Sequence, residues 1–421
     1  MEGIKNKLLK YCDWLIGTFL ILFVFWSPIS ITGTQTAVSF ALLFWLVRMF
    51  MTKKFGSDRT PLNIPIVAFL VAAAIGVIMA VDFKHSLKGY TTLGWMLIFF
   101  LIVNNVKNVT QFKRLVRILI IITTIAGAYG IFQHLTRIDF FGNVKHLHQP
   151  IARSTGFFNS PMTFGNYILL VLPVVIGLSF HSNLRREKRW LQLSGLFILT
   201  ATVFSYARAV WLGLIGGLIF MAILRSKRLL LSILAGIIVC SIFILIFPSS
   251  QFAQRAVGTF KSRRSVVVRT EFWEGSLRIL KDYPITGLGW EGFRLAYPRY
   301  KPAKGRYLVC HAHNNFVDVA VDSGLLGLGI FIWLLITIYK VSFHIFKELD
   351  DGYFKGIAWG FLGSLTAFLI AGLSQYNFGD SEVVMLFYFL LAIVMVIPRI
   401  AEKGTGYFFT NKSQDGSRKD I

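Results

Sequence analysis

Between about Pro248 and His313 an otherwise apolar chain carries a polar segment that is crowded with positive charge. Its cations are Arg255, Lys261, Arg263, Arg264, Arg269, Arg278, Lys281, Arg294, Arg299, Lys301, Lys304 and Arg306, and its acids are Glu271, Glu274, Asp282 and Glu291. Arginine binds phosphate oxygens through a planar pair of N–H donors, and histidine can take up a proton near neutral pH. The segment therefore favours chemistry on a phosphate-bearing molecule.

His313 is the candidate general base, because histidine fills that role more often than any other side chain. Asn314 and Asn315 follow it and are suited to cap the apolar helix that begins there. Asn314 is also a candidate for a substrate contact. The alternative for His313 is a hydrogen-bonded histidine at the membrane interface.

Arg208 is the first candidate ligand for an anion. It lies in Phe204-Ser-Tyr-Ala-Arg-Ala-Val-Trp, between two apolar segments. Burying an unpaired guanidinium in hydrocarbon costs at least about 2.5 kcal/mol. We interpret Arg208 as an anion clamp that faces the bundle interior; the alternative is an interfacial anchor whose guanidinium reaches the lipid headgroups.

Arg269 is the second candidate, in a segment whose apolar residues recur with helical spacing. They are Val266, Phe272, Trp273, Leu277 and Leu280. The pattern predicts an amphipathic helix along the outer surface that ends near Pro284, with Arg269 near its first turn. A phosphate there would gain from the free N–H groups of the helix start. The alternative for Arg269 is a solvated surface charge.

Three further arginines are candidates for substrate contacts. Arg153 begins Arg153-Ser-Thr-Gly-Phe-Phe-Asn-Ser-Pro, a loop on the same predicted side of the membrane. Arg263 and Arg264 precede Arg269, and we expect them to matter less because they are assigned to the surface. The turn from Asp282 to Phe293 is rich in glycine, which permits positive φ and close backbone approach.

We expect neither a metal nor a cofactor at this site. A structural zinc site needs four ligands, usually in pairs that are spaced further apart than Cys310, His311 and His313. His146 and His148 could complete the set of ligands, but the spacing still disfavours a metal site. The chain also contains no Asp-x-Asp, which disfavours a divalent-metal sugar-nucleotide transferase.

The composition is that of a membrane protein. Of 421 residues, 55% are hydrophobic and 15% are charged, whereas about 25% are charged in soluble domains. A formal net charge of +24 would suit nucleic acid. We instead assign most lysines and arginines to cytoplasmic loops, where they anchor membrane helices, and expect no nucleic-acid partner.

The sequence predicts an all-α polytopic membrane protein with about twelve transmembrane segments. They lie near 13–31, 35–51, 64–81, 90–104, 115–132, 162–180, 190–205, 208–224, 229–247, 316–339, 354–373 and 382–398. Loops rich in lysine and arginine alternate with loops poor in charge, which places both termini in the cytoplasm. The cationic loop, about 248–315 between the ninth and tenth segments, then lies outside the cytoplasm. We expect one membrane domain, 1–403, and a disordered cytoplasmic tail, 404–421.

Taken in order, several of these segments resemble the O-antigen ligase and polymerase superfamily, membrane enzymes that use undecaprenyl-pyrophosphate-linked glycans. The segments are Arg153-Ser-Thr-Gly-Phe-Phe-Asn-Ser-Pro, Ser205-Tyr-Ala-Arg208, Arg269-x3-Trp273, Pro284-Ile-Thr-Gly-Leu-Gly, His313-Asn-Asn-Phe and Asp322-Ser-Gly-Leu-Leu-Gly. They cover about residues 150–335. Asp322 stands where the family usually carries glutamate. The single large outer loop before the tenth segment is more similar to the ligases.

The resemblance implies a metal-independent, inverting glycosyltransferase in the bacterial inner membrane, with its active site facing the periplasm. Arginines that match Arg208 and Arg269 would engage the pyrophosphate of the donor, and a histidine that matches His313 would serve the acceptor. For a ligase the acceptor is a core sugar of lipid A. The expected partners are thus a lipid-linked glycan donor, a lipid A–core acceptor and membrane lipids.

Two alternatives remain open. A polymerase of the same superfamily would add repeat units to a lipid-linked chain, and the matching segments separate it poorly from a ligase. A transporter of lipid-linked glycans belongs to another class. Coupled transporters need ionisable groups within the membrane, and we place none of the 20 acidic residues at the midpoint of a predicted segment.

Overall fold

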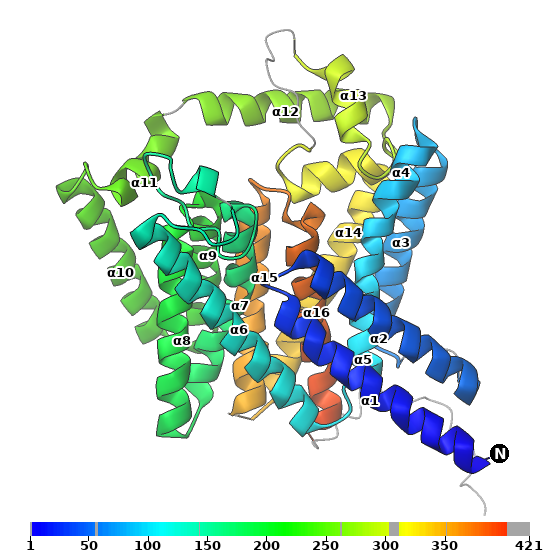
Figure 1. The fold of residues 1–421 in the computed structure, drawn as a ribbon. Coiled ribbons are helices and arrows are strands. Elements are labelled where there is room, and N and C mark those ends of the chain that lie inside the picture. Colours follow the sequence, from blue (N-terminus) through cyan, green and yellow to red (C-terminus); the bar gives the residue numbers. More distant parts are fainter. Residues whose placement is uncertain are drawn as a thin grey trace, which may run out of the picture.

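The computed structural model describes residues 2–54, 58–142, 144–261, 263–302, 311–350 and 352–401, with the backbone alone at 144, 258–261 and 263–266. The predicted tail, 404–421, lies outside these ranges. Within them the chain is helical and contains no strand, which confirms the all-α class. Figure 1 shows the long helices gathered in one bundle, with α12 lying across one end of it.

Ten helical segments of the described chain are long and apolar enough to cross a membrane. They are α1 (Glu2–Trp26), α2 (Ile31–Thr52), the run of α4 (Phe83–Tyr90), η1 (Thr91–Met96) and α5 (Leu97–Asn105), α6 (Val109–Thr136), α7 (Pro161–His181), α9 (Arg208–Arg225), α10 (Lys227–Ile246), α14 (Asn315–Glu348), α15 (Tyr353–Gly372) and α16 (Ser381–Ile400). The other two predicted segments are helical as well. The first, α3 (Asn63–Ile78), has 16 residues, and the second, α8 (Arg185–Phe204), begins with a run of charged side chains. Ten segments thus meet the criterion, and twelve stays a prediction.

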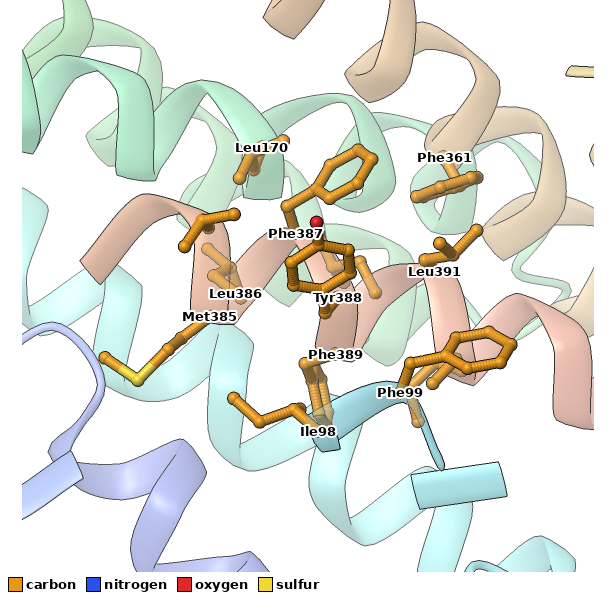
Figure 2. Close-up of a cluster of buried hydrophobic side chains, with 14 of the residues drawn as sticks. Ile98, Phe99, Leu170, Phe361, Met385, Leu386, Phe387, Tyr388, Phe389 and Leu391 are labelled. Atoms are coloured by element: carbon orange, nitrogen blue, oxygen red, sulfur yellow. The ribbon is translucent and has the colours of Figure 1, made fainter. Parts of the chain in front are cut away.

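The core of the bundle forms around α16. Figure 2 shows Phe387 of this helix in one cluster with Phe99 of α5 and Leu170 of α7. Next to it α15 packs along α7 and α9. The α7–α15 contact depends on glycine, because a Cβ at Gly177 would lie 2.1 Å from the carbonyl oxygen of Gly356. Small residues of this kind let membrane helices approach closely.

One membrane helix, α14, is broken near its start. Gly324 has a φ of 67° and a ψ of −172°, which are not helical values. The loop that begins at Pro284 fills the break. The Leu288 N–H donates to the Val321 carbonyl at 2.9 Å, and the Leu325 N–H donates to the Pro284 carbonyl at 2.8 Å. A Cβ at Gly324 would lie 2.0 Å from a backbone oxygen of this loop. The predicted close backbone approach at the glycine-rich turn is therefore confirmed.

In its described part the cationic segment forms three helices at one end of the bundle (Figure 1): α11 (Gln251–Lys261), α12 (Arg263–Asp282) and α13 (Phe293–Tyr300). The short turns η2 (Val144–His146) and η3 (Asn377–Gly379) lie in the connecting loops. As predicted, α12 ends just before Pro284.

Arg269, predicted near the first turn of α12, lies just beyond that turn. This helix begins at Arg263, so Arg269 is its seventh residue. The apolar pattern begins at Val266, and the polar residues before it are helical too. The N–H of Arg269 therefore lies beyond the first four of the helix, which are the ones left without an intrahelical partner.

Candidate functional site

Four arginines from four separate elements come together at the end of the bundle near α12. They are Arg153 in the loop after α6, Arg208 at the first position of α9, Arg255 in α11 and Arg269 in α12. Burial, with the charges of Arg255 and Arg208, lowers the pKa of Arg153 to about 10. Burial and the charge of Arg208 also lower the pKa of Arg255 and that of Arg269. The guanidinium groups are thus near enough to repel one another, and we call them the arginine cluster.

The turn between α8 and α9 positions three members of the arginine cluster. Arg153 Nε donates to the carbonyl of Ser205 at 3.2 Å, and Arg255 Nε donates to that of Tyr206 at 3.1 Å. Tyr206 is held in the left-handed region, with a φ of 49°, and Arg208 begins α9 two residues later. A single strained turn therefore sets the geometry of Arg153, Arg208 and Arg255.

The loop that carries Arg153 is itself held by Gln133, which is fully buried in α6. Its Oε1 accepts the N–H groups of Thr155 and Gly156, at 3.1 and 2.8 Å, and its Nε2 donates to the Gly156 carbonyl at 2.9 Å. The Ser154 N–H donates to the carbonyl of the last residue of α8 at 2.9 Å. The loop is thereby fixed against both α6 and α8.

Two members of the arginine cluster, Arg153 and Arg255, bind neutral groups within the described residues. Arg153 and Arg255 donate to backbone carbonyls, which are neutral, and Nη2 of Arg153 is buried without a hydrogen-bond partner. No acidic side chain in the described ranges raises the pKa of Arg153, Arg255 or Arg269. A buried charge is costly unless it is paired. The cluster is therefore suited to bind a multiply charged anion.

His313 is fixed by a buried carboxylate. The N–H groups on either side of it, from Ala312 and Asn314, both donate to Asp318, at 2.6 and 3.2 Å. Asp318 lies in the first turn of α14 and is 1% exposed. His313 has a φ of 57°, a conformation that non-glycine residues keep only when their surroundings impose it. Asp318 supplies that constraint and so positions the imidazole.

One face of α12 connects the arginine cluster to His313. Trp273 Nε1 donates to the Ala312 carbonyl at 3.1 Å, and the Phe272 ring stacks on the imidazole with 5.8 Å between centroids. Arg269 lies one turn before Trp273, on the same face of the helix. Its charge contributes to the low pKa of His313, so the two side chains are electrostatic neighbours.

His313 is neutral at physiological pH. Burial, together with the charges of His311 and Arg269, lowers its pKa to about 4. Burial also lowers the pKa of His311 to about 4. The centroids of the two imidazole rings lie 4.2 Å apart. The backbone N–H of His313 donates to Nδ1 of His311 at 3.3 Å. A neutral imidazole can accept a proton, as a general base must.

Asn314 caps α14, as predicted. Its Oδ1 accepts the N–H groups of Phe316 and Val317, at 2.9 and 3.3 Å, and its Nδ2 donates to the Leu373 carbonyl at 3.0 Å. Both ends of this amide therefore hold the helices around His313. Asn315 instead donates to Oδ1 of Asn377. A substrate contact by Asn314 stays a prediction.

Two residues of this site are missing from the sequence prediction, which singles out neither Arg255 nor Asp318. For Asp318 a signal was present, because a carboxylate is expensive within an apolar helix. Arg255 could not be distinguished from the other cations of its segment. The side chains of Arg263 and Arg264 lie outside the described residues, and their backbone forms the first turn of α12.

No group of three or more histidine, cysteine, aspartate or glutamate side chains in the described ranges could hold a metal ion. Of the residues considered for a metal, Cys310 lies outside these ranges.

A family model for O-antigen ligase matches residues 193–332, which is 140 of 421 residues or about a third of the chain. The matched range contains Arg208, Arg255, Arg269 and His313, whereas Arg153 precedes it. A search of curated proteins gave no match. The family match thus covers most of the site that the geometry defines.

Proposed function

We propose that this multi-pass membrane protein is a glycosyltransferase that moves a glycan from undecaprenyl pyrophosphate to a sugar of lipid A–core. The match of residues 193–332 to a family model for O-antigen ligase supports this proposal. The observation that carries the proposal is the arginine cluster next to a neutral His313. The pyrophosphate is the charged part of such a donor, and the cluster offers it several positive charges from rigid elements. The imidazole would then lie on the side of the acceptor.

The reaction that this arrangement supports is a direct displacement. The acceptor hydroxyl attacks the anomeric carbon, the bond from that carbon to the pyrophosphate oxygen breaks, and the configuration inverts. His313 accepts the hydroxyl proton. The leaving pyrophosphate takes the bonding electrons, and Arg208 and Arg269 stabilise its growing charge together with Arg153 and Arg255. Preorganised positive charge of this kind lowers the barrier without reorganisation during the reaction.

The acceptor decides between the two activities of the superfamily, so transfer should be measured with both candidate acceptors. We expect purified protein in liposomes to transfer a lipid-linked glycan to lipid A–core, and to do so in the presence of EDTA. Transfer only to a second lipid-linked glycan would instead identify a polymerase. Loss of activity with EDTA and recovery with Mg²⁺ or Mn²⁺ would contradict the arginine mechanism, and a requirement for an ion gradient would point to a transporter.

The proposed orientation places both termini in the cytoplasm and the site in the periplasm. It rests on the alternation of basic and charge-poor loops, and the helices α11, α12 and α13 gather at the same end as the arginine cluster (Figure 1). In a cysteine-free background, we expect Arg294→Cys to react with an impermeant maleimide from the periplasmic side. Lys188→Cys should react only from the cytoplasmic side. Labelling of both from one side would exclude this orientation.

The low pKa of His313 gives a distinctive pH dependence. In the free enzyme the histidine becomes protonated only as the pH falls to its pKa of about 4. We therefore expect kcat/KM to stay level as the pH is lowered from neutral to about one unit above that pKa. A bound pyrophosphate is anionic and opposes the effect of Arg269, so the acid limb of kcat should lie at higher pH than that of kcat/KM. Coincident limbs near the ordinary histidine pKa would contradict the assignment.

A further inference from the structure

The opposite end of the bundle contains a second cationic site. A cavity of about 1040 Å³ lies between the start of α6, the α7–α8 connection and the start of α15. From Tyr353 at this cavity, α15 runs 20 residues to Gly372, where a Cβ would lie 2.1 Å from Nδ2 of Asn315. At 1.5 Å per residue this is about 30 Å, so the cavity is separate from the arginine cluster and His313.

The charged residues of the cavity are strongly unbalanced. Lys113 and Arg117 come from α6, and Arg185 and Arg186 come from the first turn of α8. Among the described residues of the lining, Glu187 is the one carboxylate, so four cations against one acid leave three surplus positive charges. The carboxylate is itself engaged, because it accepts the hydroxyl of the adjoining Ser182 at 3.0 Å. The lining therefore selects for an anion.

The rest of the lining is apolar and continues onto the outer surface of the bundle. Ile121 and Leu184 line the cavity and are 42% and 68% exposed. Trp190 is also part of the lining and is 36% exposed, and Lys113 Nζ lies 5.0 Å from the centre of the Tyr353 ring. Aromatic rings and cations beside an apolar surface are typical of the membrane interface. An occupant must then combine a negative headgroup with hydrocarbon.

We propose that this cavity binds an anionic phospholipid from the membrane leaflet on the side opposite the arginine cluster. The phosphate lies among Arg117, Arg185 and Arg186, and the acyl chains follow Ile121 and Leu184. Basic pockets between membrane helices recognise anionic headgroups in this way. A volume of about 1040 Å³ is at the upper end of the range for small-molecule sites, as a lipid headgroup with part of its chains requires. The lipid would bridge α6, α8 and α15. It would so stabilise α15, whose other end lies against Asn315 near His313.

The full chain in neutral detergent can be tested by native mass spectrometry with phosphatidylglycerol and with phosphatidylcholine. We expect phosphatidylglycerol to be retained in preference. The double variant Arg117→Gln with Arg186→Gln should weaken this binding about tenfold to thirtyfold. The estimate follows from the binding free energy that each cation contributes near an anionic lipid. The matched control is Arg114→Gln with Arg189→Gln, which removes the same charge from exposed neighbours outside the lining and should leave binding unchanged.

Three results would overturn the proposal: equal retention of both lipids, equal losses in both double variants, or displacement of the lipid by inorganic phosphate, which would identify a soluble anion as the ligand. Should the first double variant fail to fold, Ile121→Trp keeps every cation and fills the cavity from an exposed position. It should also reduce phosphatidylglycerol binding, and normal binding by this variant would contradict the assigned path of the acyl chains.

Discussion

Replacing His313 with alanine is expected to lower single-turnover glycan transfer by about 10²–10⁴-fold, the usual contribution of a general base. Donor binding should be nearly unchanged. The reason is electrostatic: with a pKa of about 4 the imidazole is neutral at pH 7, so its removal takes no positive charge from the arginine cluster. Donor binding and single-turnover transfer should be measured on the same preparation.

His311→Ala is the matched control, because the two imidazoles lie side by side and have similarly low pKa values. Its effect should be smaller, since His311 contacts His313 and is not assigned to the acceptor. If His313→Ala binds donor poorly but transfers whatever it binds at the normal rate, His313 is a donor ligand and the base is another group.

Arg208→Lys and Arg269→Lys are each expected to lower transfer by about 10²–10³-fold, as the loss of one preorganised donor does in other enzymes. Lysine keeps the charge but loses the planar fork that matches phosphate oxygens. Arg255→Lys should be impaired too, because its Nε bond to Tyr206 fixes it in the arginine cluster. Transfer and donor affinity should be measured for all three variants.

Arg278→Lys is the control for this series. It lies in the same helix as Arg269, is exposed, and forms an ion pair with Glu274 at 2.6 Å, so we expect transfer close to that of the unmodified protein. Alanine at Arg263 or Arg264 should also cost less than either clamp substitution. Equal losses at every arginine would show that overall positive charge binds the donor, without specific ligands.

Much of the architecture could be predicted because each element is encoded locally. Apolar runs, charged loop ends and the helical spacing around Phe272 identify helices from their own residues. The cap on α14 is equally local, since Asn314 bonds N–H groups two and three residues away. The start of α12 was missed because its first residues are polar, and periodicity reports burial more than helix formation.

What the sequence by itself determined is therefore the helical membrane fold, the cationic segment and the residue types available for phosphate chemistry. Only the tertiary structure decided which cations act together. Arg153 and Arg255 are 102 positions apart in the sequence, yet they bond adjacent carbonyls at Ser205 and Tyr206. The pKa of His313 likewise depends on burial beneath α12 and on the charge of Arg269. Charges and burial act through space, over distances that sequence separation does not measure, so the selection of these residues from among 44 lysines and arginines required the packed helices.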